Sequence, residues 1–118
     1  HWMVHSFPTR RSSDLVEGPA FMAVIQPCVL GWKYPSDQTI ELARLAVDTC
    51  FWPLYEVVNG EYKLTYKPKE KKPLTDFLRK QDRFRHLFKP ENEDILAELQ
   101  EEVDRKWALL LAKCGEQA

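Results

Sequence analysis

The chain has 118 residues, of which 44% are hydrophobic and 30% are charged, a size that suits one globular unit or part of one. The 17 basic and 18 acidic residues give a net charge of −1, which disfavours general binding to nucleic acid or to an anionic membrane. No apolar run approaches the roughly 20 residues of a membrane span, and the four glycines form neither a GxGxxG turn nor a P-loop. We therefore expect no membrane span and no self-contained nucleotide site.

The three cysteines, Cys28, Cys50 and Cys114, are far apart in the sequence and form no CxxC pair. A zinc site built from this chain alone is therefore not expected. An odd number of cysteines without a secretory signal is typical of a reducing compartment, and we expect a cytoplasmic location.

Residues 1–16 lack any apolar period, unlike the residues that follow. Their core, FPTRRSSDL (Phe7–Leu15), resembles the translation of a common short-read sequencing adapter. We therefore expect residues 1–16 to be a non-native segment. The natural part is then 17–118, the C-terminal portion of a longer domain.

The run from Ala20 to Ile25 is continuously apolar and is closed by Pro27, a pattern typical of a strand buried on both faces. Ser36 or Asp37 is a candidate N-cap for a helix over 38–50. One apolar stripe of that helix comprises Ile40, Ala43, Val47 and Cys50, widened by Leu42, Leu45 and Ala46.

Residues 54–66 form two β-rich runs joined by Asn59-Gly60, a strong signal for a two-residue type I′ hairpin. That turn fixes the register and places Glu56 opposite Lys63 on the solvent-exposed face. The other face is expected to pack inward and carries Tyr55, Val57, Tyr62 and Leu64. The expected pairs are Val58 with Glu61, Val57 with Tyr62, Glu56 with Lys63, and Tyr55 with Leu64.

After a charged linker over 67–73, the sequence predicts a short helix over 74–81 that buries Leu74, Phe77 and Leu78. A longer helix is expected from Asn92 to about Cys114, ending at Gly115. Its apolar stripe comprises Leu96, Leu99, Val103, Trp107, Leu110 and Cys114. Buried strand, helix, hairpin and two C-terminal helices suit an α/β fold that is incomplete as a domain.

Cys28 is the sharpest candidate for a functional residue, because it follows the predicted strand and precedes Gly31-Trp32 on a loop. The alternative is a packed and inert thiol. Cys50 and Cys114 lie on helical apolar stripes and are expected in the core. His86 has no suggestive partner and is expected to be a surface or capping residue. The tryptophans Trp32, Trp52 and Trp107 are expected to serve packing.

Eight basic side chains between residues 67 and 85 contrast with acidic segments on either side. We call them the basic belt: Lys67, Lys69, Lys71, Lys72, Arg79, Lys80, Arg83 and Arg85. Two interpretations stay open, a solvated face and a docking patch for an acidic partner or a phosphate-bearing ligand.

Three stretches carry a resemblance: GPAFMAVIQPCVLGW (Gly18–Trp32), DQTIELARLAVDTCFWPLYEVVNGEYKL (Asp37–Leu64) and KPLTDFLRKQDRFRHL (Lys72–Leu87). They resemble the C-terminal part of the β subunit of pyruvate:ferredoxin oxidoreductase (pyruvate synthase), in the thiamine-diphosphate-dependent 2-oxoacid:ferredoxin oxidoreductase family. The Pro-Cys-x-x-Gly-Trp and Trp-Pro-Leu-Tyr-Glu elements are the more specific parts.

The resemblance implies a thiamine-diphosphate-binding fold and an enzyme that converts pyruvate and coenzyme A to acetyl-CoA and CO2, or the reverse. It implies thiamine diphosphate, Mg²⁺ and a [4Fe–4S] cluster as cofactors, with ferredoxin and other oxidoreductase subunits as partners. Cys28 would give one thiolate to the cluster nearest thiamine diphosphate, whereas the other ligands and the diphosphate-binding motifs lie upstream in the family. Val29-Leu30 stands where many members have Pro or Thr followed by Thr.

Two other functions stay open at this stage. One is the same chemistry on another 2-oxo acid, such as a branched-chain one. The other is a non-catalytic interaction module in which the basic belt binds an acidic protein and the cysteines are structural.

Overall fold

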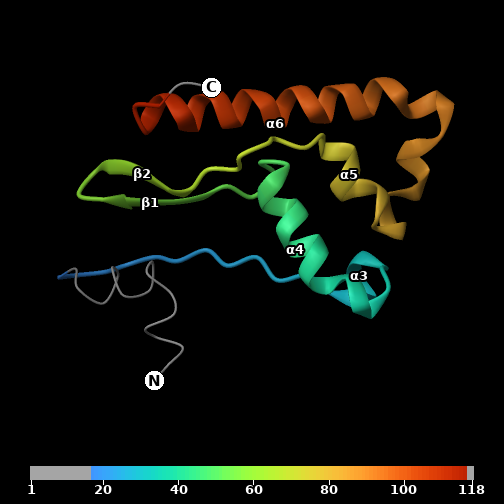
Figure 1. The fold of residues 1–118 in the computed structure, drawn as a ribbon, viewed down its shortest axis with the longest axis horizontal. Helices are drawn as coiled ribbons and strands as arrows, with labels where there is room; N and C mark the ends of the chain where they lie inside the picture. The colour runs from blue at the N-terminus through green and yellow to red at the C-terminus, as the bar shows by residue number, and fades with distance from the viewer. Residues whose placement is uncertain (1–16, 117–118) are drawn as a thin grey trace.

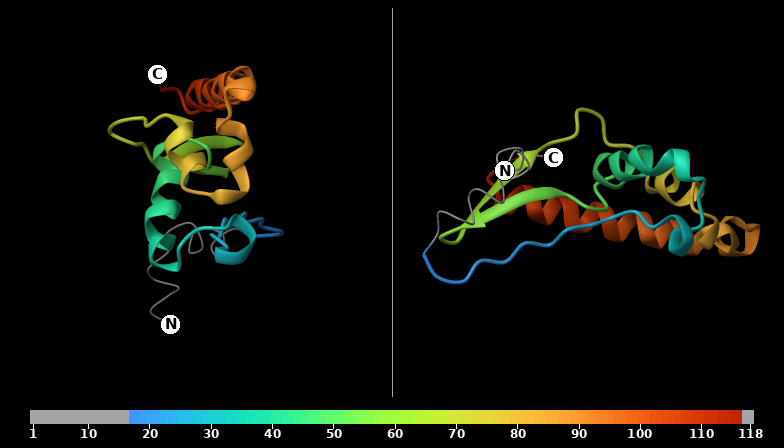
Figure 2. Two further views of the ribbon diagram at one scale, coloured as in Figure 1. Left: turned by 90° about the vertical axis from the view of Figure 1, so that its right-hand side faces the viewer. Right: turned by 90° about the horizontal axis from the view of Figure 1, so that it is seen from below.

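The computed structural model describes residues 17–116, so the expected non-native segment 1–16 lies outside the described residues. Figure 1 shows the long helix α6 along one side of the molecule, with the hairpin and α5 beside it and α4 and α3 further away. Figure 2 shows the same layers from two other directions. The elements are α3 (Val29–Trp32), η1 (Ser36–Gln38), α4 (Thr39–Asp48), β1 (Leu54–Val58), β2 (Glu61–Tyr66), α5 (Leu74–Arg79), η2 (Asp82–Phe88), η3 (Pro90–Asn92) and α6 (Glu93–Lys113).

Residues 20–27 form no strand, so the predicted buried strand is wrong for this chain. Phe21 is 91% exposed and Val24 is 75% exposed. These residues belong to an extended segment over 20–27, here called the arm, which leads to α3 in Figure 1. A strand buried on both faces needs neighbouring strands to satisfy its backbone groups. The sheet found within 17–116 has only β1 and β2, and neither pairs with this arm.

The predicted helix over 38–50 is confirmed as α4, preceded by the 3-10 turn η1. The predicted capping by Ser36 or Asp37 is wrong. Gln38 occupies the N-cap position without a side-chain cap bond, and Thr39 Oγ1 donates to the carbonyl of Ser36 at 3.1 Å. Because the 3-10 turn occupies the residues before α4, a short side chain there cannot take the usual capping geometry.

The buried face of α4 is narrower than the predicted stripe. Leu42, Leu45 and Ala46 are buried, whereas Ile40 is 66% exposed. The stripe through Ile40 follows the helical period, but the layer that covers α4 lies over Leu42 and Ala46 instead.

The predicted hairpin register is confirmed at all four expected pairs, from Val58 with Glu61 to Tyr55 with Leu64. Asn59 and Gly60 both have positive φ, 51° and 81°, as a type I′ turn requires. The expected inward face is only partly buried. Tyr62 and Leu64 of β2 pack against other apolar side chains, while Tyr55 and Val57 of β1 are 43% and 46% exposed.

The helical predictions for the C-terminal half are confirmed. Helix α5 buries Leu74, Phe77 and Leu78, and α6 runs from Glu93 to Lys113 with Gly115 at φ 71° just after it. Leu99 of the predicted α6 stripe is 38% exposed, and Leu111 is buried in addition to the expected residues. The 3-10 segment η2 between the two helices was not predicted.

Two groups of buried side chains make the core. The first cluster joins α4 and α5, and its buried members are Tyr34, Leu42, Leu45, Ala46, Leu74, Phe77 and Leu78. The second cluster lies between α6 and the hairpin, and its buried members are Cys50, Trp107, Leu110 and Leu111. Val103 of α6 packs against both clusters.

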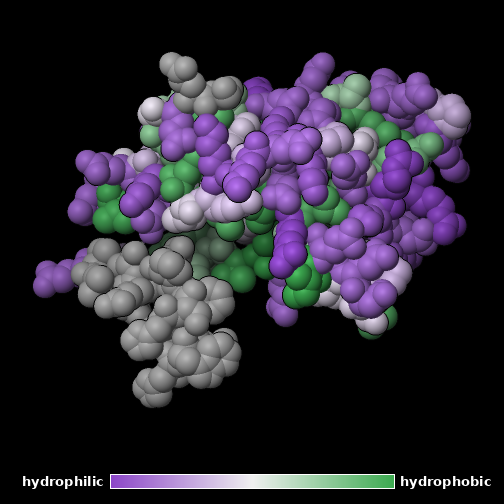
Figure 3. Space-filling view, in the orientation of Figure 1, coloured by the Kyte–Doolittle hydropathy of each residue, from purple (hydrophilic) through white to green (hydrophobic). Residues whose placement is uncertain are grey.

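The surface carries several exposed apolar side chains besides those of the arm. Leu30 is 87% exposed. Figure 3 shows apolar residues gathered in the middle of one face, below the hairpin.

No helix within 17–116 is both long and apolar enough to cross a membrane. The cytoplasmic location stays a prediction.

Candidate functional site

Cys28 lies at the point where the exposed arm turns into α3. It occupies the N-cap position with extended backbone angles, and its Sγ accepts the N–H of Gly31 at 3.3 Å. The N–H of Trp32 donates to the Cys28 carbonyl at 2.8 Å and closes the turn. The side chain of Cys28 is exposed, so the alternative of a packed thiol is wrong in this structure.

Gly31 leaves room for the sulfur. A Cβ at this position would lie 3.2 Å from Cys28 Sγ, which is closer than Cβ atoms normally approach a neighbour. The Cys-x-x-Gly spacing therefore has a local reason: glycine donates its N–H to the sulfur and places no Cβ against it, whereas a larger residue would require the sulfur to shift by a few tenths of an ångström.

The loop that carries Cys28 is fixed to the rest of the molecule by Trp32. The Trp32 ring meets the fully buried Phe77 ring edge to face, with centroids 5.9 Å apart. One residue further, the carbonyl of Lys33 accepts the N–H of Asp82 at 2.8 Å. Helix α3 is thus held by contacts with both α5 and η2.

Arg83 of η2 is half-buried against the last residue of α3, Trp32. Its guanidinium carbon lies 4.7 Å from the centroid of the Trp32 ring and 4.5 Å from that of Phe84. Its Nε donates to Gln81 Oε1 at 2.8 Å, and the buried Gln81 donates to the Phe77 carbonyl at 3.0 Å. Burial lowers the pKa of Arg83, and the nearby Cys28 acts in the opposite direction.

The other two cysteines pack as expected. Cys50 is 4% exposed and belongs to the second cluster, and Cys114 is half-buried against it. Burial raises the pKa of the Cys50 thiol above its ordinary value of 9.0. Among residues 17–116, no three His, Cys, Asp or Glu side chains come close enough to hold a metal ion together.

His86 is exposed, as predicted, and its backbone carbonyl accepts the side-chain amide of Asn92 at 2.6 Å. The tryptophans also serve packing as predicted: Trp32 and Trp52 pack against the first cluster, and Trp107 is buried in the second.

Half of the basic belt is engaged in ion pairs within the chain. The pairs are Lys67 with Glu116, Lys71 with Asp104, Lys80 with Glu41, and Arg85 with Asp82. Arg79 lies over the Phe88 ring at 4.5 Å. These contacts favour the interpretation of the basic belt as a solvated surface whose charges are largely paired within the chain. A docking role for the belt stays a prediction.

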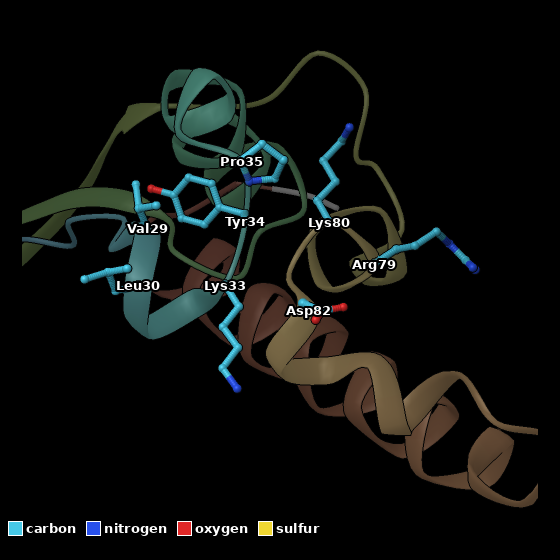
Figure 4. A pocket seen from close by; sticks show the side chains of 8 residues that line it. All are labelled: Val29, Leu30, Lys33, Tyr34, Pro35, Arg79, Lys80 and Asp82. Atoms are coloured by element: carbon cyan, nitrogen blue, oxygen red, sulfur yellow. The ribbon is translucent and has the colours of Figure 1, made fainter.

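A shallow depression of about 510 Å³ lies between α3 and the end of α5, lined by Val29, Leu30, Lys33, Tyr34, Pro35, Arg79, Lys80 and Asp82. Figure 4 shows that the side chains of Lys33, Arg79 and Lys80 extend away from one another. Because the three positive charges do not converge, the depression lacks the geometry of an anion site.

Sequence reasoning missed Gln81 and Arg83 as neighbours of the Cys28 loop. Gln81 is a buried polar residue directly after a short apolar helix, and Arg83 was assigned only to the basic belt. Their link to the loop, through the contact of Arg83 with Trp32, depends on how η2 folds back onto α3, which leaves no periodic signal in the sequence.

No family model matches the chain, but curated relatives do. It is 50% identical over 96 residues to the pyruvate synthase subunit PorB of Thermotoga maritima and 50% identical over 95 residues to PorB of Methanocaldococcus jannaschii. It is 43% identical over 101 residues to the ketoisovalerate oxidoreductase subunit VorB of Pyrococcus abyssi. These matches cover 80%, 80% and 84% of this chain.

The chain spans about 30% of the length of each of these relatives. The predicted resemblance is confirmed by the identities, which extend over most of the described residues. Over most of its described residues the chain is therefore similar to one segment of the pyruvate synthase PorB and ketoisovalerate oxidoreductase VorB subunits.

Proposed function

We propose that this chain is the C-terminal part of the thiamine-diphosphate-binding domain of an enzyme that oxidatively decarboxylates pyruvate with coenzyme A to acetyl-CoA and CO2, or runs the reverse reaction, with ferredoxin as the electron carrier. The observation that carries this proposal is the 50% identity to two PorB subunits. Because the chain spans about 30% of those subunits, we expect it to be inactive alone and to act within an assembly of several subunits.

Cys28 suits the role of one ligand to a [4Fe–4S] cluster. Such a cluster takes four thiolates, and this chain supplies a single exposed cysteine, since Cys50 is buried and Cys114 half-buried. The Cys28 sulfur lies on an open surface, with Gly31 keeping one side free of a Cβ. The donor set therefore fits a chain that contributes one ligand to a site completed elsewhere in the enzyme.

The residues around Cys28 have identifiable tasks in this proposal. The Gly31 N–H donates to Sγ, and such bonds stabilise negative charge on sulfur and tune a metal centre. Trp32 packs against Phe77 and shields one side of the loop from water. When bound, thiamine diphosphate supplies the electron sink for decarboxylation, and the cluster passes electrons one at a time.

Pyruvate is the first candidate substrate, because two PorB relatives reach 50% identity. The other PorB relatives, at 42–44%, overlap the 43% identity to the VorB subunit of Pyrococcus abyssi. A branched-chain 2-oxo acid is the second candidate, supported by that VorB relative. Steady-state rates of the assembled enzyme with pyruvate and with 2-ketoisovalerate decide between them. A kcat/KM at least as high for 2-ketoisovalerate would contradict the pyruvate assignment.

The ligand role of Cys28 is tested by Cys28→Ala and Cys28→Ser in the complete subunit, assembled with its partner subunits. Both variants should change the electron paramagnetic resonance signal of the cluster nearest thiamine diphosphate and depress ferredoxin reduction. Cys114→Ser is the matched control, because it removes a thiol far from α3 and should leave the signal unchanged. An unaltered spectrum in both Cys28 variants would refute the assignment.

A further inference from the structure

The depression between α3 and the end of α5 combines an apolar lining with positive charge around it. Its apolar lining comprises Val29, Leu30, Tyr34 and Pro35, and its basic residues are Lys33, Arg79 and Lys80. Leu30 is 87% exposed, so this apolar side chain has little cover from the described residues. An apolar centre with a polar rim is the usual arrangement of a protein–protein contact.

Two of the three basic residues have no carboxylate partner within residues 17–116. Lys80 and Asp82 are each paired with a residue outside the depression. Lys33 and Arg79 form no ion pair among the described residues. Arg79 contacts the Phe88 ring at 4.5 Å, and an aromatic face attracts a cation without cancelling its charge. Two positive charges beside the apolar lining are therefore available to a partner.

The positions of these two charges select the shape of the partner. Figure 4 shows that the side chains of Lys33 and Arg79 extend away from one another, which does not suit a compact anion. An extended polypeptide segment suits them, because carboxylates on either side of an apolar residue reach both charges while that residue covers Leu30. The backbone of Lys33 is fixed for this contact: it has φ 58° at the C-cap of α3, and its carbonyl accepts the Asp82 N–H at 2.8 Å.

The exposed apolar surface favours a permanent cover over a transient partner. Permanent contacts are more apolar than transient ones, and a folded protein rarely leaves such surface open to water. The chain spans about 30% of the length of the PorB relatives. Most of a subunit of that length therefore lies outside this chain and is a source for the cover.

We propose that the depression is a docking surface within the subunit. A segment with Asp or Glu residues around an apolar anchor, from the part of the subunit that this chain lacks, covers Leu30 and pairs with Lys33 and Arg79. The proposal rests on the proposed function in one respect, that the chain is a segment of a longer subunit. It involves no cofactor and no catalytic step.

Cross-linking of the assembled enzyme tests the pairing. A water-soluble carbodiimide joins an amine to a carboxylate in direct contact, and peptide mass analysis identifies both ends of the link. We expect Lys33 to be linked to an Asp or Glu of the same subunit, outside the stretch that matches this chain. Arg79→Lys keeps the charge and adds an amine, so it should give a second link from position 79 to the same segment.

The identity of the linked peptide decides the source of the cover. Enzyme assembled from equal amounts of isotopically labelled and unlabelled subunits separates links within one copy from links between two copies. Links within one copy support the proposal. Links from Lys33 to another subunit, to a second copy or to a separate protein overturn it. A Lys33 that is unlinked and is acetylated as fast as Lys69 and Lys72 overturns it as well.

Acetylation rates measure how well the segment covers Lys33. The rate at each lysine of the assembled enzyme is divided by the rate at the same lysine in the urea-unfolded subunit, which removes intrinsic differences in reactivity. We expect this normalised rate to be about fivefold lower for Lys33 than for Lys69 and Lys72, two exposed lysines outside the depression.

Two variants separate the apolar contact from a general loosening of the subunit. Leu30→Ser should abolish most of the protection of Lys33. Ile40→Ser is the matched control and should preserve it, because Ile40 is 66% exposed and does not line the depression. Equal losses in both variants, or full protection in an assembled Leu30→Ser enzyme, would overturn the proposal. If Leu30→Ser fails to assemble, the cross-link in the unsubstituted enzyme decides.

These readouts are independent of the proposed function. They use neither activity nor the signal of the cluster, so an enzyme without activity on pyruvate can still show the link from Lys33. Conversely, an enzyme that oxidises pyruvate can lack that link, and the failure of one proposal is then distinguishable from the failure of the other.

Discussion

The backbone N–H of Leu74 donates to Oε1 of Gln100 at 2.7 Å, so a side chain in the middle of α6 caps the first residue of α5. The N-cap of α5 is Pro73, which offers no side-chain acceptor. The N–H groups of a helix's first turn need partners from outside the helix, and here one of them is supplied 26 residues along the chain. Gln100 in turn donates to Asp104 at 2.9 Å, and the same carboxylate accepts Lys71.

Gln100→Leu should lower the free energy of unfolding by about 1–2 kcal/mol, because it leaves the part-buried N–H of Leu74 without an acceptor. Gln100→Glu keeps an acceptor for Leu74 and should cost less. Urea unfolding of the chain followed by far-UV circular dichroism measures both. Equal losses in the two variants would mean that the bond to Leu74 is not the cause.

Asp104 should make the stability of the chain sensitive to acid. The hydrogen bond from Lys71 holds the pKa of Asp104 below its ordinary value of 3.8, with a smaller contribution from Gln100. A carboxyl whose pKa is lower in the folded state stabilises the fold above its unfolded pKa, and this stabilisation disappears as the pH falls through the folded pKa. The free energy of unfolding should therefore drop below about pH 4.

The variant Asp104→Asn should flatten this acid dependence. Glu101→Gln is the matched control, since Glu101 is exposed on the same helix and forms no ion pair within the described part of the chain. Unfolding midpoints measured between pH 3 and pH 6 compare the three proteins. Parallel curves for Asp104→Asn and the unsubstituted chain would rule out this origin of the acid sensitivity.

Cys28 and Cys50 should differ in reactivity. The Cys50 thiol is buried, which raises its pKa, whereas the Cys28 thiol is exposed. At pH 8, iodoacetamide should modify Cys28 at least about tenfold faster than Cys50, as judged by peptide mass analysis. Comparable rates in the folded chain would show that Cys50 is accessible, and addition of urea should make the rates converge.

The raised pKa of Cys50 also predicts a loss of stability in alkali. A thiol with a higher pKa in the folded state stabilises the fold below its unfolded pKa and loses that contribution as the pH rises through the folded value. Cys50→Ala should remove this dependence above about pH 9, at the cost of a small cavity beside Trp107.

The turn of the hairpin should tolerate few residues at Gly60. Its φ of 81° suits glycine, and nothing lies within 4 Å of the position a Cβ would take, so the cost of substitution is conformational and not steric crowding by neighbours. Gly60→Val should reduce stability by about 1–2 kcal/mol, whereas Asn59→Gly should be nearly neutral. Thermal unfolding distinguishes the two, and a neutral Gly60→Val would contradict the type I′ assignment.

The parts of the fold that the sequence predicted correctly depend on near neighbours along the chain. The hairpin register follows from two turn residues, and the apolar periods of α5 and α6 are repeated within each helix. The arm over 20–27 has the composition of a buried strand, yet no strand pairs with it among the described residues. Composition reports which surfaces are suited to burial, and burial itself depends on whether a partner is present.

The candidate site shows the same division. The Cys-x-x-Gly-Trp spacing was enough to identify Cys28 as the candidate residue. The features that shape its sulfur, the Gly31 N–H and the absence of a Cβ at Gly31, lie only three residues away. The environment supplied by Gln81 and Arg83 comes from more than 50 positions away in the sequence. No local pattern distinguishes Arg83 from the other members of the basic belt, and only the contact with Trp32 separates it from them.

The position of Val103, packed against both clusters, has a consequence for how the molecule comes apart. Both clusters depend on α6, because side chains of this helix pack in each of them. Slow amide exchange along α6 should therefore be lost in the same event from its Leu96 turn to its Leu110 turn, and Val103→Ala should accelerate exchange at both ends together. The helix makes a single cooperative unit out of two small interiors.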